Sequence, residues 1–418
     1  MSFARKIVGF AGAGCLVVFA LQAAAQQTLS LSDAQRLALN RSQQLVANDA
    51  AASAVRESTV AAGQLPDPVL KLGVENVPLS GAARFSLSRD DMTMQRIGVT
   101  QEFTRGDKLR LRVERVQRDG DRLRAERLET TALVQRETAL AWIERHYARR
   151  LEQLVLQQVE ENRLQVDGAE LAFRTGRGSQ ADVFAARAAV ANVDDQLRLT
   201  QRRMEGARIM LARWIGHDAA GAAPAGQVPW QQAPAAVALL QRLQDLPALQ
   251  VLQAQVAAAE TEVRQAQADR RADVTVEAMY GRRPAYPDMF SIGVSIPLPI
   301  HRAGRQDREV AARLATLTEV QARYQDALAA QEGALRAQLN EWESGRDRVG
   351  RLQAELLSAS RNRTEGALSS YRSGKGDLLA VFAARRDELD ARMQVLQLEM
   401  DTARLWAQLN FIVPHDVH

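Results

Sequence analysis

Hydrophobic and polar positions alternate in four short stretches of this chain. In FSIGVSI (290–296), Phe290, Ile292 and Val294 fall on one face of an extended strand, and the small polar residues between them fall on the other. The stretches 66–76, 95–103 and 272–281 alternate in the same way. One apolar face and one polar or small face per strand is typical of a barrel wall with lipid outside and water inside. The sequence therefore predicts four membrane-type strands per chain.

A different pattern, with the period of an α-helix, fills most of the remaining sequence. No proline occurs in 105–172 or in 302–371, and at 1.5 Å per residue each segment reaches roughly 100 Å. The last helix has two apolar seams with spacings of three and four: Leu389, Met393, Leu396, Met400, Ala403 and Ala407 in one, and Val395, Leu398, Thr402, Leu405, Leu409 and Ile412 in the other. Two seams predict a neighbouring helix on each side, as in a wall of helices that closes into a tube.

The chain is a tandem repeat. FRTGRGSQADVFAAR begins at Phe173 and YRSGKGDLLAVFAAR begins at Tyr371, 198 positions later (371 − 173), and eight of the fifteen positions are identical. Each half is expected to run helix, strand, strand, long helix, glycine turn, helix. This gives a first repeat over 26–215, a Gly-, Ala- and Pro-rich connector over 216–246, a second repeat over 247–413 and a tail over 414–418. The expected fold class is mainly α with a small β part.

Residues 1–25 are typical of a secretory signal peptide. Arg5 and Lys6 precede an apolar stretch, and Ala23 and Ala25 suit cleavage before Gln26. The only cysteine, Cys15, lies inside the apolar stretch; whether it is lipidated stays open.

Composition excludes several classes of function. The formal charge of +4 falls to +2 once Arg5 and Lys6 are removed, and arginines are interleaved with acids, so no nucleic-acid surface is expected. No phosphate-binding loop, catalytic triad or metal-ligand cluster is present, so we expect no enzyme, no cofactor and no metal site. The pair His415 and His418 fits a ragged end better than a metal site, and Met92 and Met94 fit barrel packing.

Four strands cannot close a barrel. Their open edges cannot face lipid, because unpaired backbone groups find no water there. Three copies would supply twelve strands, within the range of outer-membrane barrels, so a homotrimer in outer-membrane lipid is expected.

The chain resembles the TolC-type outer membrane factors, the exit tubes of tripartite efflux pumps and of type I secretion. The resemblance covers 26–414 and rests on the tandem repeat, the two glycine turns, and the strand exits QEFTRG (101–106) and PLPIHRAG (297–304). It implies a trimer with a twelve-stranded barrel in the outer membrane and an α-helical tunnel through the periplasm. PDPVLKLGVENVP, MTMQRIGVTQEF and GDKLRLR most resemble the heavy-metal cation efflux branch.

By this resemblance, the two repeated stretches are periplasmic tips of helical hairpins that meet a periplasmic adaptor. The adaptor in turn serves an inner-membrane transporter, which the resemblance to the metal branch implies is of the RND type. The glycines allow a tight reversal and the basic residues pair with the adaptor or donate to its backbone carbonyls. The expected docking residues are Arg174, Gly176, Arg177, Gly178, Arg372, Gly374, Lys375 and Gly376.

The resemblance also implies a gate at the tips. In the family an aspartate of the first tip pairs with a tyrosine of the second, and the matching residues here are Asp182 and Tyr371. Ala380 and Ala383 occupy positions where many relatives have rings of aspartate, and Asp377, one turn nearer the tip, is a candidate replacement.

Three other functions stay open as alternatives: a type I secretion exit duct, a periplasmic adaptor or structural coiled coil, and an exported enzyme. An adaptor needs lipoyl-like and β-barrel domains around one hairpin, a coiled coil does not explain the strand faces, and no motif supports an enzyme. The transported species, a metal cation or a drug, is not encoded in this sequence.

Overall fold

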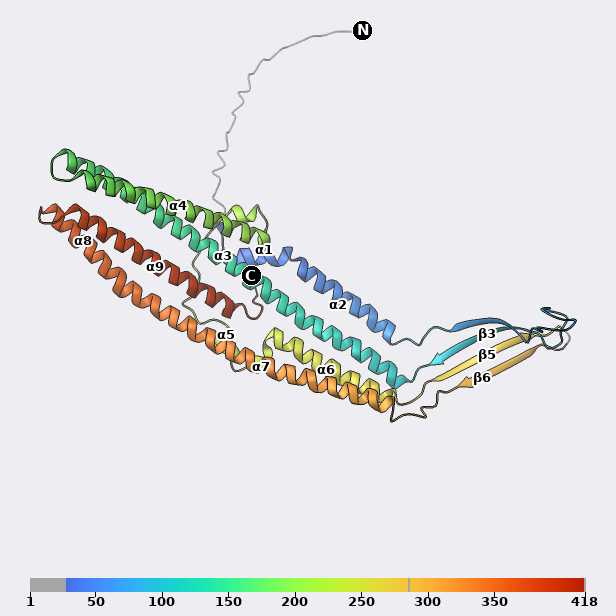
Figure 1. Ribbon diagram of the computed structural model, residues 1–418. Coiled ribbons are helices and arrows are strands. Elements are labelled where there is room, and N and C mark those ends of the chain that lie inside the picture. The colour runs from blue at the N-terminus through green and yellow to red at the C-terminus, as the bar shows by residue number, and fades with distance from the viewer. Residues whose placement is uncertain (1–27, 285, 417–418) are drawn as a thin grey trace, which may run out of the picture.

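The protein is elongated, with a sheet at one end and the tips of two helical hairpins at the other (Figure 1). The computed structural model describes residues 28–284 and 286–416. The predicted signal peptide and Cys15 lie outside these residues. Both described chain ends lie near the middle of the long axis, beside the packed central part of the molecule.

The two halves of the chain follow the same order of elements. The first half contains α1 (Leu31–Arg41), α2 (Gln43–Ala62), β2 (Val69–Glu75), β3 (Met94–Phe103), α3 (Gly106–Arg174) and α4 (Gln180–Ile215). The second half contains α6 (Pro247–Ala268), β5 (Val274–Arg282), β6 (Met289–Ser295), α7 (Gln306–Arg351), the π-helical segment η3 (Leu352–Leu357), α8 (Ser358–Arg372) and α9 (Leu378–Asn410). The mainly helical fold with a small β part and a tandem repeat is confirmed.

The four strands form one antiparallel sheet in the order β2-β3-β5-β6, so the two repeats join between β3 and β5. The register places Leu72, Ile97, Tyr280 and Phe290 side by side in one row, and places Lys71, Gly98, Met279 and Ser291 in the adjacent row. Successive rows face opposite sides of a sheet. The apolar positions predicted from the sequence therefore share one face, which we call the apolar face.

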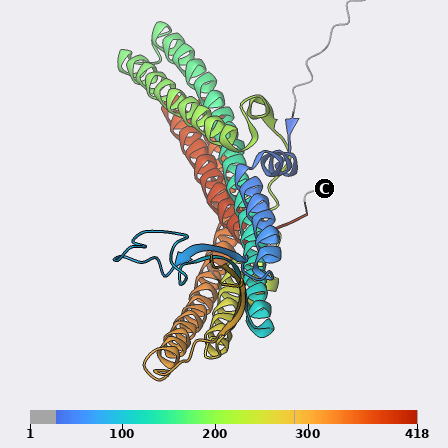
Figure 2. The same cartoon turned by 90° about the vertical axis from the view of Figure 1, so that its right-hand side faces the viewer.

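The long helices form the body of the molecule. α3 contains 69 residues, and shorter helices lie along it in two stretches: α2 and α6 beside the half near the sheet, α4 and α9 beside the half near the tips (Figures 1 and 2). α7 contacts α6 and then α9, both on the side that faces α3. The last helix, α9, has α3 on one side and α7 and α8 on the other, as its two seams predict.

Two tryptophans at equivalent repeat positions anchor the centre. Trp142 of α3 donates its indole N–H to the carbonyl of Leu29, and Trp342 of α7 donates to the carbonyl of Trp230, each at 2.9 Å. Both indoles are fully buried in the largest apolar core. Each long helix is therefore held at its middle by a segment that crosses it.

The connector 216–246 is a packed element of this core. It contains η1 (Ala219–Gly221), β4 (Ala223–Pro224), α5 (Ala236–Leu239) and η2 (Leu243–Asp245), and β4 pairs in parallel with β1 (Thr28–Leu29). Its side chains Ala220, Val228, Trp230 and Ala236 are buried. A Gly-, Ala- and Pro-rich composition marks where the repeats join, but small residues also allow close packing across the long helices.

The chain end is held in place as well, which contradicts the expectation of a ragged end at His415. The backbone N–H and carbonyl of His415 bond to the buried side chain of Gln135 at 2.9 and 2.6 Å. The imidazole contacts the carbonyl of Asn410 at 2.7 Å. His418 lies outside the described residues.

A partly buried histidine beside the central core makes the protein sensitive to acid. His146 stacks on Trp142, with ring centroids 5.0 Å apart. Burial, and then the positive charges of Arg150 and Arg149, lower the pKa of His146 from 6.5 to about 4. The unfolded chain therefore binds a proton that the folded chain excludes between these values, and stability is lost as the pH falls from 6.5 toward 4.

We expect His146→Phe, which keeps a stacked ring without a titrating group, to remove this part of the acid sensitivity. The wild type should lose roughly 2 kcal/mol more than the variant between pH 7 and pH 4, an order-of-magnitude value reduced for partial exposure of the ring. Thermal unfolding of the detergent-solubilised protein, followed by circular dichroism across this pH range, measures the difference. Parallel curves for the two proteins would contradict the assignment.

Candidate functional site at the hairpin tips

Both tips reverse the chain through the same backbone motif. At the first tip the N–H of Gly176 donates to Phe173 O at 3.0 Å and the N–H of Arg177 donates to Ala172 O at 2.9 Å. The second tip repeats these two bonds from Gly374 and Lys375. This is the Schellman motif, which needs a left-handed residue after the helix. Gly176 and Gly374 have φ of 70° and 72°, as predicted for a tight reversal.

The second glycine of each tip has a different role. A Cβ on Gly178 would lie 3.1 Å from the Cβ of Ala172, and one on Gly376 would lie 2.9 Å from the Cβ of Ser370. The chain therefore passes too close to the end of the first helix for a larger residue. The spacing G-x-G thus combines one left-handed position with one position of close approach.

The helices that follow the tips begin differently. Ser179 and Asp182 form a capping box at the start of α4: the Ser179 hydroxyl accepts from the N–H of Asp182, and the Asp182 carboxylate accepts from the N–H of Ser179 at 2.8 Å. Hydrogen bonds from the Ser179 N–H and then from its hydroxyl lower the pKa of Asp182 below 3.8. At the start of α9, Asp377 is the N-cap residue but makes no side-chain cap bond.

The capping box occupies the carboxylate that the family resemblance assigns to the gate. Among the described residues, Ser179 is the hydrogen-bond partner of Asp182, and no bond joins Asp182 to Tyr371. Tyr371 is exposed at the end of α8. Ala380 and Ala383 are exposed on α9. A gate formed by Asp182, Tyr371 and Asp377 stays a prediction.

The basic residues of the tips fall into two groups. Glu170 pairs with Arg187 of α4 at 2.8 Å and with Arg174 at 3.7 Å, so the cation of Arg174 is partly used within the first hairpin. The Arg187 hydrogen bond is the main cause that lowers the pKa of Glu170. Within residues 28–284 and 286–416, no ion pair involves Arg177, Arg372 or Lys375, and all three are exposed. These three cations are therefore available to a partner.

At the opposite end of the molecule, the second face of the sheet carries charge. Lys71 pairs with Glu277 at 2.6 Å across Gly98, and Arg96 pairs with Glu75 at 2.6 Å. A Cβ on Gly98 would clash with the side chain of Met279. The glycine therefore leaves room for Met279 to lie over β3. We call this the polar face, and its partly exposed charged pairs contrast with the apolar face on the other side.

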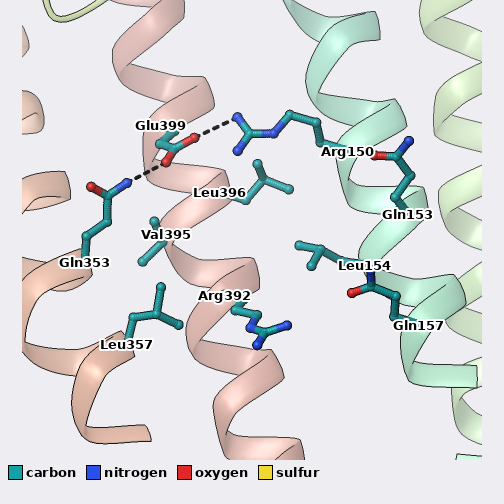
Figure 3. Close-up of a pocket in the computed structure, with 10 residues that line it drawn as sticks. All are labelled: Arg150, Gln153, Leu154, Gln157, Gln353, Leu357, Arg392, Val395, Leu396 and Glu399. Atoms are coloured by element: carbon teal, nitrogen blue, oxygen red, sulfur yellow. Dashed lines mark hydrogen bonds and ion pairs between the residues drawn. The ribbon is translucent and has the colours of Figure 1, made fainter. Parts of the chain in front are cut away.

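Sequence reasoning missed a polar junction between the two hairpins. Glu399 of α9 is buried, and its two oxygens accept from Arg150 of α3 and from Gln353 of η3, each at 2.8 Å (Figure 3). These residues line a groove of about 350 Å³ together with Leu154, Leu357, Arg392, Val395 and Leu396. A glutamate between the two apolar seams of the last helix, one turn after Val395 and Leu396, was the available signal, because a buried carboxylate requires partners.

The described residues contain neither a metal-binding cluster nor a membrane-crossing helix. Across 28–284 and 286–416, no three His, Cys, Asp or Glu side chains are grouped to hold a metal ion. None of the helices in this part of the chain is long and apolar enough to span a bilayer.

The second half of the chain is similar in sequence to a known protein family. Residues 239–413 match the family model described as outer membrane efflux protein. No curated protein sequence matches this chain.

Solved structures match nearly the whole chain. VceC, an outer membrane protein of Vibrio cholerae, is 19% identical, with a TM-score of 0.74 over 91% of this chain and 95% of that one. CusC, described for conformational changes in transmembrane channel formation, is 15% identical, with a TM-score of 0.76 over 92% of each chain. The outer membrane channel CmeC of Campylobacter jejuni is 14% identical, with a TM-score of 0.74 over 91% of this chain and 85% of that one.

The second repeat therefore matches the outer membrane efflux protein family, and nearly the whole chain has the fold of these solved channels, in agreement with the resemblance seen in the sequence.

We expect Ser179→Ala to loosen the start of α4, because it removes one half of the capping box. Amide exchange over 180–184 should rise about fivefold, the effect of losing a typical N-cap bond. The matched control is Asp377→Ala at the second tip, which makes no cap bond and should leave exchange over 378–382 unchanged. Equal effects of the two substitutions would contradict the difference between the tips.

Proposed function

We propose that three copies of this chain form an outer-membrane exit channel that conducts substrate passively from the periplasm to the exterior. The sheet carries this proposal: its apolar face fits lipid, its polar face fits a water-filled lumen, and β2 and β6 each pair on one side within the described chain. Lipid offers no partner to the free backbone groups of these two edges. Pairing β6 of one copy with β2 of the next closes a barrel of twelve strands.

The helical part of the chain extends this lumen. The two long segments leave the same end of the sheet with α6 between them, and α3 alone spans roughly 100 Å at 1.5 Å per residue. Three copies supply twelve helical columns for a tunnel, and the tips open at its far end. This places the barrel in the outer membrane and the tunnel in the periplasm, in agreement with the family description of the second repeat.

The tips fit a docking role toward a periplasmic adaptor. Arg177, Arg372 and Lys375 are exposed and make no ion pair among the described residues. Backbone carbonyls and carboxylates at the end of another helical hairpin are suitable acceptors for them. The adaptor would link the channel to an inner-membrane transporter, which supplies the energy and the selectivity.

The finer assignment is to an RND-type pump for heavy-metal cations or drugs, based on the resemblance of 66–78, 92–103 and 106–112 to the metal branch. A type I secretion duct is the alternative, and the charge of the lumen does not discriminate between them. An adaptor function is disfavoured because the strands here form one open sheet with an apolar face.

A gate at the tips would join Asp182 to Tyr371. Both Ser179 bonds go to Oδ2 of the Asp182 carboxylate, so Oδ1 could accept from the hydroxyl of Tyr371, and Asp377 would line the same opening. Making and breaking this bond would provide a two-state element.

We expect Ile292→Arg to abolish membrane assembly and Ser291→Arg to be tolerated. The two residues are neighbours on β6 and both are exposed in the single chain, Ile292 at 69%, but they point to opposite faces. An arginine on the lipid face near the bilayer midplane costs about 2–4 kcal/mol per chain, whereas one in a lumen stays hydrated. Heat-modifiable trimer bands from outer-membrane fractions measure assembly.

The reverse result, with Ser291→Arg as the damaging substitution, would assign the lipid to the other face. A wild-type chain that purifies as a monomer without detergent would overturn the channel altogether.

For the gate, we expect Asp182→Ala to raise the ion conductance of purified trimers in planar bilayers. Ser179→Ala is the matched control, because it weakens the capping box but keeps the carboxylate. Conductance that rises equally in both variants would assign the effect to fraying of the tip, and unchanged conductance in Asp182→Ala would remove this residue from the gate.

A further inference from the structure

The methionines of the four-stranded sheet all lie on its polar face. Met94 begins β3, Met279 lies within β5 and Met289 begins β6. Met94 pairs with Glu75 and Met289 pairs with Gly281, and these rows alternate with the rows of the apolar face. In the described strands no methionine occupies the apolar face, where a hydrophobic side chain suits lipid. Contact with lipid therefore does not explain where these methionines lie.

Two glycines of the polar face leave room for two of these side chains. A Cβ on Gly281 of β5 would clash with the sulfur of Met94, which comes from β3. A Cβ on Gly98 of β3 would clash with the side chain of Met279, which comes from β5. Each methionine therefore crosses to the neighbouring strand, and the sulfur of Met94 lies directly over the strand that carries Met279.

The three methionines surround Gly281. Met289 of β6 is directly opposite Gly281, and the Cβ positions of such a pair are about 4.5–5.5 Å apart. Met279 precedes Gly281 by two residues on the same face, a separation of about 6–7 Å along a strand. A methionine side chain is long and flexible, so both sulfurs can reach the sulfur of Met94. We call these three residues the methionine group.

The methionine group lies at the end of the sheet that is farthest from the helices. β3 and β6 begin at this end, next to the loops that connect the strands (Figure 1). Met94 is only 8% exposed, whereas Met289 is 43% exposed in the single chain. Met289 is therefore the member that is open to solvent, and the sulfur of Met94 is held in place behind it by packing.

The charged side chains around the methionine group are already paired. Arg96 is the β3 neighbour of Gly281, and it pairs with Glu75 at 2.6 Å. Lys71 pairs with Glu277 at 2.6 Å. The charge of this part of the polar face is thus balanced, and the thioethers themselves are neutral. Sulfur chemistry, and not net charge, distinguishes this surface from the rest of the face.

Neutral sulfur ligands favour one class of cation. Thioethers are soft ligands that suit Cu(I), whereas carboxylates, carbonyls and water suit Mg²⁺, Ca²⁺ and Mn²⁺. Three thioethers offer no negative charge to offset a divalent cation that leaves water, and the penalty for moving a charge out of water is large. A soft monovalent cation needs less compensation and gains most from sulfur.

We propose that Met94, Met279 and Met289 form a transient binding site for a soft monovalent cation, Cu⁺ or Ag⁺, at the outer mouth of the channel. The inference rests on the proposed function, since the polar face lines a lumen only in the assembled barrel, and it narrows the substrate to soft metal cations. Three copies place three such sites around the mouth. Conduction requires a site that binds but also releases the ion, and a ligand set without a carboxylate fits this requirement.

Silver-ion binding to purified trimers tests the site without relying on transport. Equilibrium dialysis in chloride-free buffer measures the affinity for Ag⁺, and X-ray absorption at the silver edge identifies sulfur neighbours. Met289→Leu removes an exposed sulfur and keeps a hydrophobic side chain of similar volume. We expect it to weaken Ag⁺ binding about tenfold or more, at least the loss seen when a group that only supports a metal ligand is removed.

Met210→Leu is the matched control. Met210 of α4 is 56% exposed and lies on a helix far from the sheet, so it reports binding by an isolated surface methionine (Figure 1). We expect no change in Ag⁺ affinity. Zn²⁺ is the control ion, because it prefers thiolate, imidazole and carboxylate ligands, and Met289→Leu should not alter its binding. If Met289→Leu does not assemble, Met279→Leu removes a second sulfur of the group.

The outcomes separate the site from the channel. Unchanged Ag⁺ binding in Met289→Leu, or in Met279→Leu when the first variant does not assemble, overturns the site even if the trimers conduct ions. Equal weakening by Met210→Leu, or a matching loss of Zn²⁺ binding, also overturns it, because the effect would then not come from a soft-cation site. A selective loss of Ag⁺ binding without ion conductance of the trimers in planar bilayers keeps the site and refutes the proposed channel. A selective loss in trimers that conduct ions supports both.

Discussion

Unpaired backbone groups at the edges of β2 and β6 constrain everything else in this protein. The four-stranded sheet cannot bury its apolar face within its own chain. The helices extend from one end of the sheet, in line with the strands, and do not cover either face. Assembly with further copies in lipid satisfies both: the strand edges pair with the next copy, and the apolar face contacts lipid. The long helices then follow as the continuation of a ring of strands, because each strand exit leads directly into one of them.

The centre of the chain solves a second problem, which is how to fix helices of this length. An isolated helix of 69 residues has no tertiary support of its own. Trp142 and Trp342 supply it at equivalent points, each donating to a backbone carbonyl of a segment that crosses the helix. The connector is therefore as much a part of the central core as the helices. The two halves of the chain are held together where Trp142 and Trp342 lie.

From this level to the tips the repeats have diverged in packing while keeping their turns. Both tips keep the Schellman motif with a left-handed glycine. The first hairpin adds apolar clusters and a capping box, whereas the second has a π turn and polar contacts. Duplication gave two copies of one hairpin, and the two copies now differ in how their helices are packed and capped.

The sequence by itself determined the elements whose chemistry is local. Alternation along each strand identified Ile97, Val99 and Ile292 as one face, and the repeated G-x-G predicted the turns, because strand periodicity and positive φ depend on a few neighbouring residues. Only the tertiary structure decided the packing of the connector and the junction at Glu399. Each depends on which segments meet across distances of up to 249 positions, from Arg150 to Glu399. A single sequence does not specify these long-range contacts, since each charged residue could pair with many oppositely charged residues elsewhere in the chain.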